Sequence, residues 1–259
     1  MTSPLRTMIR DLHRRRGRER RGLALAEGVR LVEEALAADL PMPGAAFSPA
    51  LEGTTRGRAL KAALERRAVR LEPVSDSELT ALADTEHPQG VVAVIEPPRW
   101  ALADIAAAPG RPALVLDGVQ DPGNVGTMLR SALGLGAAGV VALKGTAELT
   151  SPKVVRGSMG ALFRLPAVVS DAEALVGWAR ERGVELWVAA TDGEPLEPGA
   201  AREHGTAVGL VVGNEGAGVS PALAAAARRR VGIRLTPGAE SLNVAIAAAI
   251  LLREVARVD

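Results

Sequence analysis

The sequence predicts an α/β protein whose larger, C-terminal part is built on a mostly parallel sheet. Apolar runs alternate with helical patterns along the 259 residues, and such alternation is typical of parallel strands joined by helices. The run ALVLD, residues 113–117, is continuously apolar, as a strand covered on both faces is. Four prolines between residues 97 and 112 flank an alanine-rich segment, which indicates a linker. We therefore expect a small α/β domain over residues 1–98, a linker over 99–111 and the larger domain over 112–259.

The first domain is expected to alternate short helices with short strands. The spacing of its apolar residues gives the helices, and brief apolar runs give the strands. Ser75 and Glu78 form the pattern of a capping box, which marks the start of a further helix. The expected elements are helices over 21–38 and 56–67, an apolar stretch at 45–48, and strands over 69–72 and 90–95.

The second domain continues with five more strands after residues 113–117. They are expected over 139–143, 165–169, 184–190, 208–212 and 231–235, with helices over 125–135, 171–182, 221–229 and 242–255. The last helix contains LNVAIAAAILL and is apolar nearly all round. Such a helix is buried on every side, so we expect it to pack between the sheet and a further surface, such as a second subunit.

Residues 134–139 read GLGAAG, which has the spacing of a dinucleotide-binding loop. That loop must follow a strand and open a helix. Here the order is reversed, because the run follows a predicted helix and precedes a predicted strand. We interpret it as the end of a helix and a tight return to the sheet.

The amino-acid composition excludes several classes of functional site. The chain has no cysteine, which excludes disulfides, thiolate metal sites and cysteine nucleophiles. Neither a signal-peptide-like stretch nor an apolar run of bilayer length is present, so the cytoplasm is the expected compartment and no membrane partner is expected. Residues 1–30 contain nine arginines and three acidic residues, a net charge of +6, whereas the rest of the chain carries −5. The run HRRRGRERR, residues 13–21, is either a phosphate-binding arm for nucleic acid or a solvated helix face.

Three polar, glycine-rich loops follow predicted strands, at residues 117–130, 213–221 and 236–243. Ligands of parallel sheets gather at the carboxyl ends of strands. Taken singly, Asn124, Ser241 and Asn243 could be helix N-caps and the Glu215 loop a plain helix-entry turn. Taken together, the loops offer hydroxyl, amide, carboxylate and guanidinium groups, which suit orientation of hydroxyl groups better than hydrolysis by a triad or by zinc.

These loops resemble the motifs of the SpoU (TrmH-like) family of the SPOUT superfamily, which are ribose 2′-O-methyltransferases of structured RNA. The resemblance spans essentially the whole chain, and the combination of motifs in this order is highly specific. The stretch SPKVVRGSMGALFRLP, residues 151–166, and residues 75–94 of the N-terminal half are also similar to family sequences. The matching motif residues are Asn124 and Arg130, then Gly213, Glu215 and Gly218, then Ser241, Leu242 and Asn243. One departure is Ala245, where the family usually has a second serine.

The resemblance implies a deep trefoil knot that binds S-adenosylmethionine, a ribosomal-protein-like RNA-binding domain in front of it, and a homodimer joined through the knot region and the last helix. By motif position, the cofactor-binding residues are Thr191, Gly213, Ile233, Leu235, Ser241 and Leu242. The residues expected to contact RNA are Arg14, Arg15, Arg16, Arg18 and Arg156.

The implied reaction is transfer of a methyl group to a ribose 2′-hydroxyl, with 23S ribosomal RNA as the favoured substrate. The expected catalytic residues are Asn124, Arg130, Glu215 and Asn243. A guanidinium with a pKa above about 12 is a poor base, so we expect Arg130 to clamp a phosphate and stabilise charge on oxygen. Two alternatives remain: a tRNA ribose methyltransferase, and an RNA-binding protein that kept the fold without the chemistry.

Overall fold

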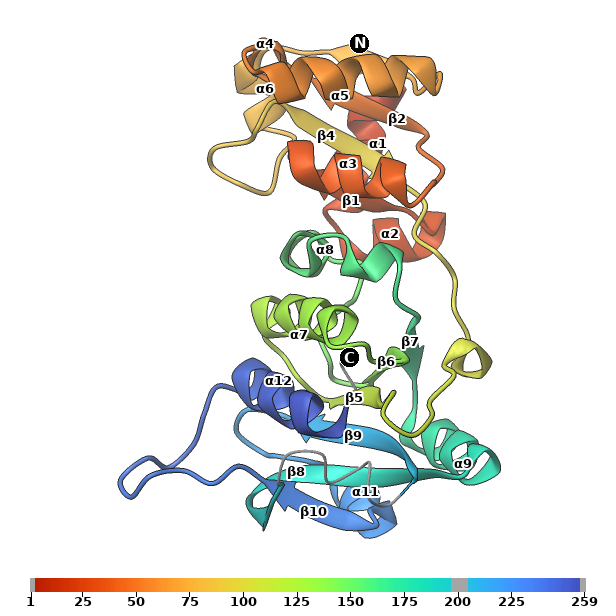
Figure 1. Cartoon of the computed structure of the whole chain (residues 1–259). Helices are drawn as coiled ribbons and strands as arrows, with labels where there is room; N and C mark the ends of the chain where they lie inside the picture. The colour runs from red at the N-terminus through yellow and green to blue at the C-terminus, as the bar shows by residue number, and fades with distance from the viewer. Residues whose placement is uncertain (1–2, 197–204, 257–259) are drawn as a thin grey trace. The chain divides into compact units, whose positions relative to one another are not determined.

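The computed structural model describes residues 3–196 and 205–256 and consists of two compact units (Figure 1). The first unit is Met1–Pro98 together with Thr150–Phe163, and the second is Arg99–Leu149 together with Arg164–Asp259. Residues 150–163 therefore group with the N-terminal unit, although the sequence analysis assigns them to the larger domain. None of the helices in the described ranges is long and apolar enough to cross a bilayer.

The first unit contains a four-stranded sheet in the order β1-β4-β2-β3. Its central strand β4 pairs antiparallel with β1 and β2, and β3 lies parallel to β2 at one edge. The strands are β1 (Ala24–Glu27), β2 (Gly44–Phe47), β3 (Leu71–Pro73) and β4 (Val91–Ile95). The helices of residues 3–98 are α1 (Pro4–Leu12), α2 (Arg15–Arg21), α3 (Val29–Ala37), α4 (Pro49–Glu52), α5 (Thr55–Arg66) and α6 (Asp76–Thr80). The predicted capping box at α6 is confirmed.

The prediction of one helix over residues 21–38 is wrong. Ala24–Glu27 is the fully buried strand β1, and α3 begins only after it. Gly28 separates the two with a φ of 92°, a conformation that breaks a helix and that glycine adopts at little cost. Three consecutive apolar residues followed by Glu27 are compatible with either a strand or a helix, so only the pairing with β4 decides between them.

The second unit contains a six-stranded sheet in the order β10-β8-β9-β5-β6-β7, with all its neighbouring strands parallel. This confirms the predicted fold class. The strands are β5 (Ala113–Asp117), β6 (Gly139–Leu143), β7 (Ala167–Ser170), β8 (Val184–Pro195), β9 (Ala207–Gly213) and β10 (Arg229–Gly232). The helices are α7 (Pro122–Gly134), α9 (Ala172–Arg182), α11 (Pro221–Ala226) and α12 (Val244–Val255), with a 3-10 turn η1 (Leu102–Asp104).

The core of this unit follows from the apolar runs that predicted its strands. Val115, Val141 and Val211 from three adjacent strands are almost fully buried and pack with Leu175 and Trp178 of α9. Helices α12 and α7 of this unit also pack against each other, and Figure 1 shows them side by side. Helix α7 carries the motif residues Asn124 and Arg130, and α12 begins directly after Asn243.

The GLGAAG run is not a dinucleotide-binding loop. Helix α7 ends at Gly134, the chain turns through Gly136 with a φ of 74°, and β6 begins at Gly139. The interpretation as a helix end and return to the sheet is confirmed.

Helix α8 (Pro152–Ser158) belongs to the first unit and was not predicted. It packs against β1 and is followed by the 3-10 turn η2 (Ala161–Phe163). Between them, Gly160 has a φ of 88°, and a Cβ there would lie 2.8 Å from Cβ of Glu34 on α3. A glycine is therefore required where α8 ends against α3.

Candidate functional site

Asn124 lies in the first turn of α7, just beyond the end of β5. The N-cap of this helix is Asp121, whose Oδ1 accepts a hydrogen bond from the backbone N–H of Asn124 at 2.7 Å. Asp121 therefore performs the capping role that Asn124 could have had. The side-chain amide of Asn124 remains available for other contacts.

This amide joins the three polar loops. Its Nδ2 donates to Oε1 of Glu215 at 3.1 Å, and its Oδ1 accepts from Nδ2 of Asn243 at 3.0 Å. Asn124 is separated in the sequence from Glu215 by 91 positions and from Asn243 by 119 positions. We call Asn124, Glu215 and Asn243 the loop network. The expectation that the three strand-end loops converge is confirmed by these contacts.

Asn243 is both a helix cap and a member of the loop network. Its Oδ1 accepts from the backbone N–H groups of Ala245 at 2.9 Å and Ile246 at 3.3 Å, which caps α12. Its Nδ2 is left to reach Asn124. Ala245, which stands where the family usually has serine, is buried with 2% of its surface exposed, so a methyl group fits this position.

Glu215 is held as a carboxylate. Burial alone would raise its pKa, but the hydrogen bond from Asn124 and those from backbone N–H groups, including Gln120 at 3.3 Å, lower the pKa below its ordinary value of 4.5. A lowered pKa stabilises the folded state above 4.5, and this contribution is lost as the pH falls through the lowered value. The network is therefore fully formed at neutral pH, with Glu215 as acceptor.

Two residues that sequence reasoning missed hold the Glu215 loop in place. The side chain of Asn214 donates to the carbonyl of Gly118 at 2.9 Å and accepts from the N–H groups of Gly216 and Ala217, both at 2.9 Å. Buried Asp117, the last residue of β5, accepts from the N–H of Ser220 at 2.7 Å. In the sequence, Asp117 ends the apolar run of β5 and Asn214 directly follows that of β9, and this position at a strand end could have identified both residues.

Gly213 begins the same loop. A Cβ there would lie 2.2 Å from the carbonyl carbon of Gly218 and 2.3 Å from the nitrogen of Val219. Any side chain would therefore force the loop open. The glycine pattern that marked this loop in the sequence reflects a close approach of the chain to itself.

Arg130 is not brought to the loop network. It is exposed on α7 and makes no hydrogen bond or ion pair with residues 3–196 or 205–256. Six residues separate it from Asn124, which is about 240° around the helix axis at 3.6 residues per turn. Within one chain, Arg130 therefore faces away from the network.

The predicted cofactor residues lie at the ends of three adjacent parallel strands. Thr191 is in β8 and Gly213 ends β9, while Ile233 and Leu235 follow β10. Ile233 and Leu235 are half-buried, and Ser241 and Leu242 are exposed in the segment before α12. The carboxyl ends of neighbouring parallel strands share one edge of the sheet, which gathers these residues near the loop network.

The arginines of residues 13–21 differ in exposure. Arg14, Arg15 and Arg16 are exposed around the start of α2, and Arg15 pairs with Glu19 at 2.7 Å. Arg18 is different, and its assignment as an RNA contact is wrong. It is 6% exposed and donates to the carbonyls of Leu12 at 2.8 Å and His13 at 2.9 Å, so it ties α2 to the end of α1.

The chain matches two family models. One is the SpoU rRNA Methylase family, over residues 111–253, and the other is the MRM3-like substrate binding domain, over residues 7–93. Between them, these matches cover most of both units.

The similarity extends to whole relatives. RlmP, the 23S rRNA (guanosine(2553)-2′-O)-methyltransferase of Bacillus subtilis strain 168, is 35% identical over 246 residues, or 94% of this chain and 92% of that protein. A 23S rRNA (uridine(2479)-2′-O)-methyltransferase of Streptomyces viridochromogenes is 31% identical over 257 residues, 95% of this chain and 86% of its own. The AdoMet-bound rRNA methyltransferase of Sinorhizobium meliloti superimposes with a TM-score of 0.84 at 30% identity, over 98% of this chain and 95% of that one.

Proposed function

This chain belongs to the SpoU rRNA methylase family, and we propose that it transfers a methyl group from S-adenosylmethionine to a ribose 2′-hydroxyl of 23S ribosomal RNA. The observation that carries the proposal is the loop network, in which Asn124 joins Glu215 to Asn243. These residues occupy the three family motifs, and Asn124 contacts each of the other two directly. The 23S rRNA methyltransferases among the relatives support the choice of substrate.

The residues at the strand ends fit the proposed cofactor. Half-buried Ile233 and Leu235 offer apolar surface for an adenine ring, and the backbone groups beside them offer hydrogen bonds. Added Cβ atoms at Gly218 and Gly238 would meet no atom within 4 Å, so the space beside these two glycines is open to a ligand. We expect the trefoil knot in these same segments, and we propose that residues 112–259 are the catalytic domain and residues 1–98 the RNA-binding domain.

The protein's part in the reaction is to position the ribose. Bound S-adenosylmethionine supplies an activated methyl group on a sulfonium, which an oxygen can attack directly. Asn124 and Asn243 hold two loops against each other, so that polar groups on both face the same sugar. Ionised Glu215 accepts from Asn124 and keeps this amide in one orientation. Such preorganisation is worth several orders of magnitude in rate when donor and acceptor are held in line.

We propose that the enzyme is a homodimer and that Arg130 acts on the site of the partner subunit. Leu242, Ile246 and Ile250 form an exposed apolar stripe along the start and outer face of α12, and Leu133 of α7 is exposed as well. Leu133 lies three residues after Arg130, on the same side of α7. A second copy that covers the stripe would therefore bring its own site close to Arg130, where the guanidinium can clamp a phosphate and stabilise charge on the ribose oxygen.

Replacing Ile246 with aspartate should convert the dimer into a monomer. Ile246 is 53% exposed in one chain, so the folded monomer tolerates the change, whereas a buried charge at an interface costs several kcal/mol. Light scattering coupled to size exclusion measures the mass. Val169→Asp is the matched control, because Val169 is 72% exposed on the edge strand β7 of the same unit and outside the stripe. A dimer that survives Ile246→Asp contradicts the proposed interface.

The proposed activity is tested by incubating the protein and S-adenosylmethionine with a 23S rRNA transcript or with total tRNA. Mass spectrometry of the digested RNA then reports 2′-O-methylated nucleosides. We expect methylation of one nucleotide of 23S rRNA, in keeping with a site of action in the cytoplasm, where ribosomes are made. Methylation of tRNA alone favours the tRNA alternative. RNA binding without methylation, and without calorimetric binding of S-adenosylhomocysteine, favours the non-catalytic one.

A further inference from the structure

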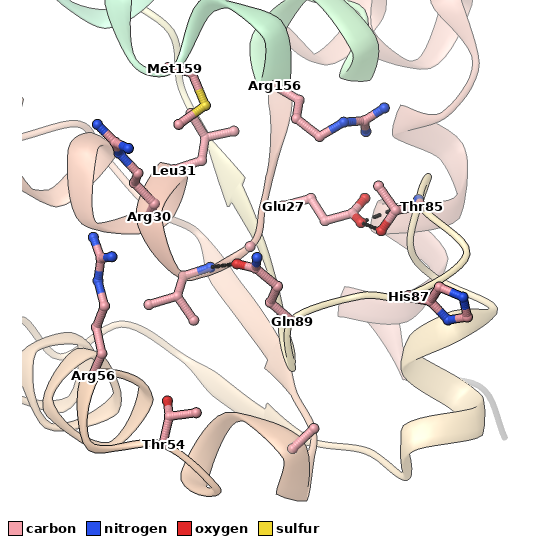
Figure 2. A pocket seen from close by; sticks show the side chains of 13 residues that line it. Glu27, Arg30, Leu31, Thr54, Arg56, Thr85, His87, Gln89, Arg156 and Met159 are labelled. Carbon is pink, nitrogen blue, oxygen red and sulfur yellow. Dashed lines mark hydrogen bonds between the residues drawn. The ribbon is translucent and has the colours of Figure 1, made fainter.

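The first unit contains a pocket of about 680 Å³ that includes no member of the loop network. Its walls come from the junction of β1 with α3, the start of α4 and α5, the loop that precedes β4, and the end of α8 (Figure 2). All of these segments belong to one compact unit. A volume of this size is within the range of pockets that hold small organic ligands.

Arginines give the pocket its charge. Arg30 and Arg56 lie on one side in Figure 2, and Arg156 lies on the other. Arg56 pairs with Glu33 at 2.5 Å and Arg156 with Asp84 at 2.8 Å, and neither acidic partner lines the pocket. Each fork of guanidinium N–H groups has more donors than one carboxylate uses, so both arginines keep donors for a ligand.

Arg30 adds a cation without a counterion. It is exposed, and across residues 3–196 and 205–256 it forms neither an ion pair nor a hydrogen bond. The carboxylate in the pocket wall, Glu27, is already engaged by the N–H of Asp84 at 2.7 Å and by the hydroxyl of Thr85. Glu27 keeps its negative charge, but both of its oxygens are engaged within the wall, whereas the guanidinium of Arg30 is available to bind an anion.

Neutral polar groups lie between the arginines. Gln89 occupies the middle of the pocket in Figure 2, and His87 lies beside it on the side of Arg156. Oε1 of Gln89 accepts from the N–H of Val29 at 3.2 Å, so the first turn of α3 is already capped. The amide and the imidazole are groups that form hydrogen bonds with the edges of nucleobases, and a guanidinium plane stacks on their faces.

The wall formed by α8 is fixed in place before any ligand binds. Met159, which lines the pocket, has a φ of 49°, and the next residue, Gly160, closes against Glu34 of α3. A left-handed methionine is uncommon and persists only where its surroundings impose it. The packing of α8 on β1 and α3 imposes it here, so the pocket is preformed on this side.

We propose that this pocket holds one unpaired nucleotide of the RNA substrate, with its phosphate at Arg30 and Arg56 and its base between Gln89, His87 and Arg156. The proposal rests on the proposed function, because it identifies where the methylated RNA is recognised. Side chains cannot read paired bases through the deep, narrow major groove of an A-form helix, whereas an unpaired base can enter a pocket. The exposed Arg14, Arg15 and Arg16 would add contacts with phosphates and no selectivity.

The test compares two labelled RNAs by fluorescence anisotropy with the full-length protein. One is a duplex of about 20 base pairs, which spans the length a protein module covers on double-stranded RNA. The other is the same duplex with a short single-stranded bulge. We expect the wild-type protein to bind the bulged RNA roughly tenfold more tightly, and Arg30→Ala to remove this preference.

Two further variants distinguish RNA binding by the pocket from general attraction between arginines and phosphates. Ala50→Trp fills the pocket from an exposed position of α4 without changing any charge, and it should also remove the preference. Arg66→Ala removes an exposed arginine of α5 outside the pocket and should preserve it. Thermal unfolding of each variant confirms that it is folded. Three results would overturn the proposal: equal binding of both RNAs by the wild type, a preference that survives Arg30→Ala and Ala50→Trp, or loss of the preference in Arg66→Ala.

Methyl transfer to 23S rRNA is measured in parallel, so the two proposals can fail separately. An active enzyme whose KM for RNA is unchanged by Arg30→Ala contradicts the pocket alone. A wild-type protein that discriminates between the two RNAs but transfers no methyl group contradicts the methylation alone.

Discussion

Replacing Arg130 with alanine should lower kcat for methyl transfer by a factor of at least about 10² while leaving the affinity for S-adenosylhomocysteine unchanged. The physical reason is its position. Arg130 is exposed on α7 and has no counterion in the described part of its own chain, so its charge is available to a substrate oxygen or phosphate. The proposed cofactor residues lie at the ends of β8, β9 and β10 and do not include it.

Arg130→Lys sharpens this prediction, because lysine keeps the charge and loses the planar fork that binds phosphate in two places. We expect it to restore only a small part of the rate. Arg182→Ala is the matched control, since Arg182 is an exposed arginine at the end of α9 in the same unit. Equal loss of cofactor binding and rate in Arg130→Ala would show that the residue has a structural role. Mixing inactive Arg130→Ala with inactive Asn124→Ala subunits should restore part of the activity if Arg130 acts on the partner's site.

The strands and helices of the second unit are well predicted from the sequence because the same local pattern, an apolar strand followed by a helix, recurs along the chain. Continuous apolar runs such as ALVLD, repeated between helical patterns, are typical of strands buried on both faces, and parallel strands place their carboxyl ends at one edge. The meeting of Asn124, Glu215 and Asn243 follows from this rule together with the family motifs. The particular hydrogen bonds do not follow from it. That Asp121 caps α7 and frees Asn124 depends on the turn at Pro122, which several geometries would satisfy.

The first unit is harder to predict because its elements are short and its charges are abundant. A strand of four residues, β1, carries no period that separates it from a helix. Burial of Arg18 depends on the turn between α1 and α2, and a run of arginines gives no sign of which member faces inward. Arg30 and Arg56 are far apart in the sequence and share a pocket only because α3 and α5 pack together. Pair contacts of this kind are set by tertiary packing.

Replacing Asn124 with aspartate should make the enzyme's activity depend on pH in a way that the wild-type activity does not. The aspartate keeps an oxygen that can accept from Asn243, but it replaces the Nδ2 donor with a carboxylate oxygen facing Oε1 of Glu215, at a distance that is 3.1 Å in the wild type. Two carboxylates this close cannot both be ionised without strong repulsion, so the pKa of one of them rises. Above this raised pKa, the two loops are pushed apart. Below it, the protonated acid donates in place of the lost amide and the loop network forms again.

The expected rate of Asn124→Asp relative to wild type is therefore lowest at high pH, by a factor of about 10², and rises as the pH falls toward the raised pKa, which lies above the ordinary value of 4.5. The wild type supplies the reference over this range, since the pKa of its Glu215 is lowered and the carboxylate stays ionised. Asn124→Ala is the matched control, because it removes both side-chain hydrogen bonds and adds no charge. Its rate relative to wild type should be low and independent of pH. A flat pH profile for Asn124→Asp would show that Asn124 and Glu215 are not in contact in the working enzyme, and the hydrogen-bonded convergence of the three loops could then no longer carry the proposed activity.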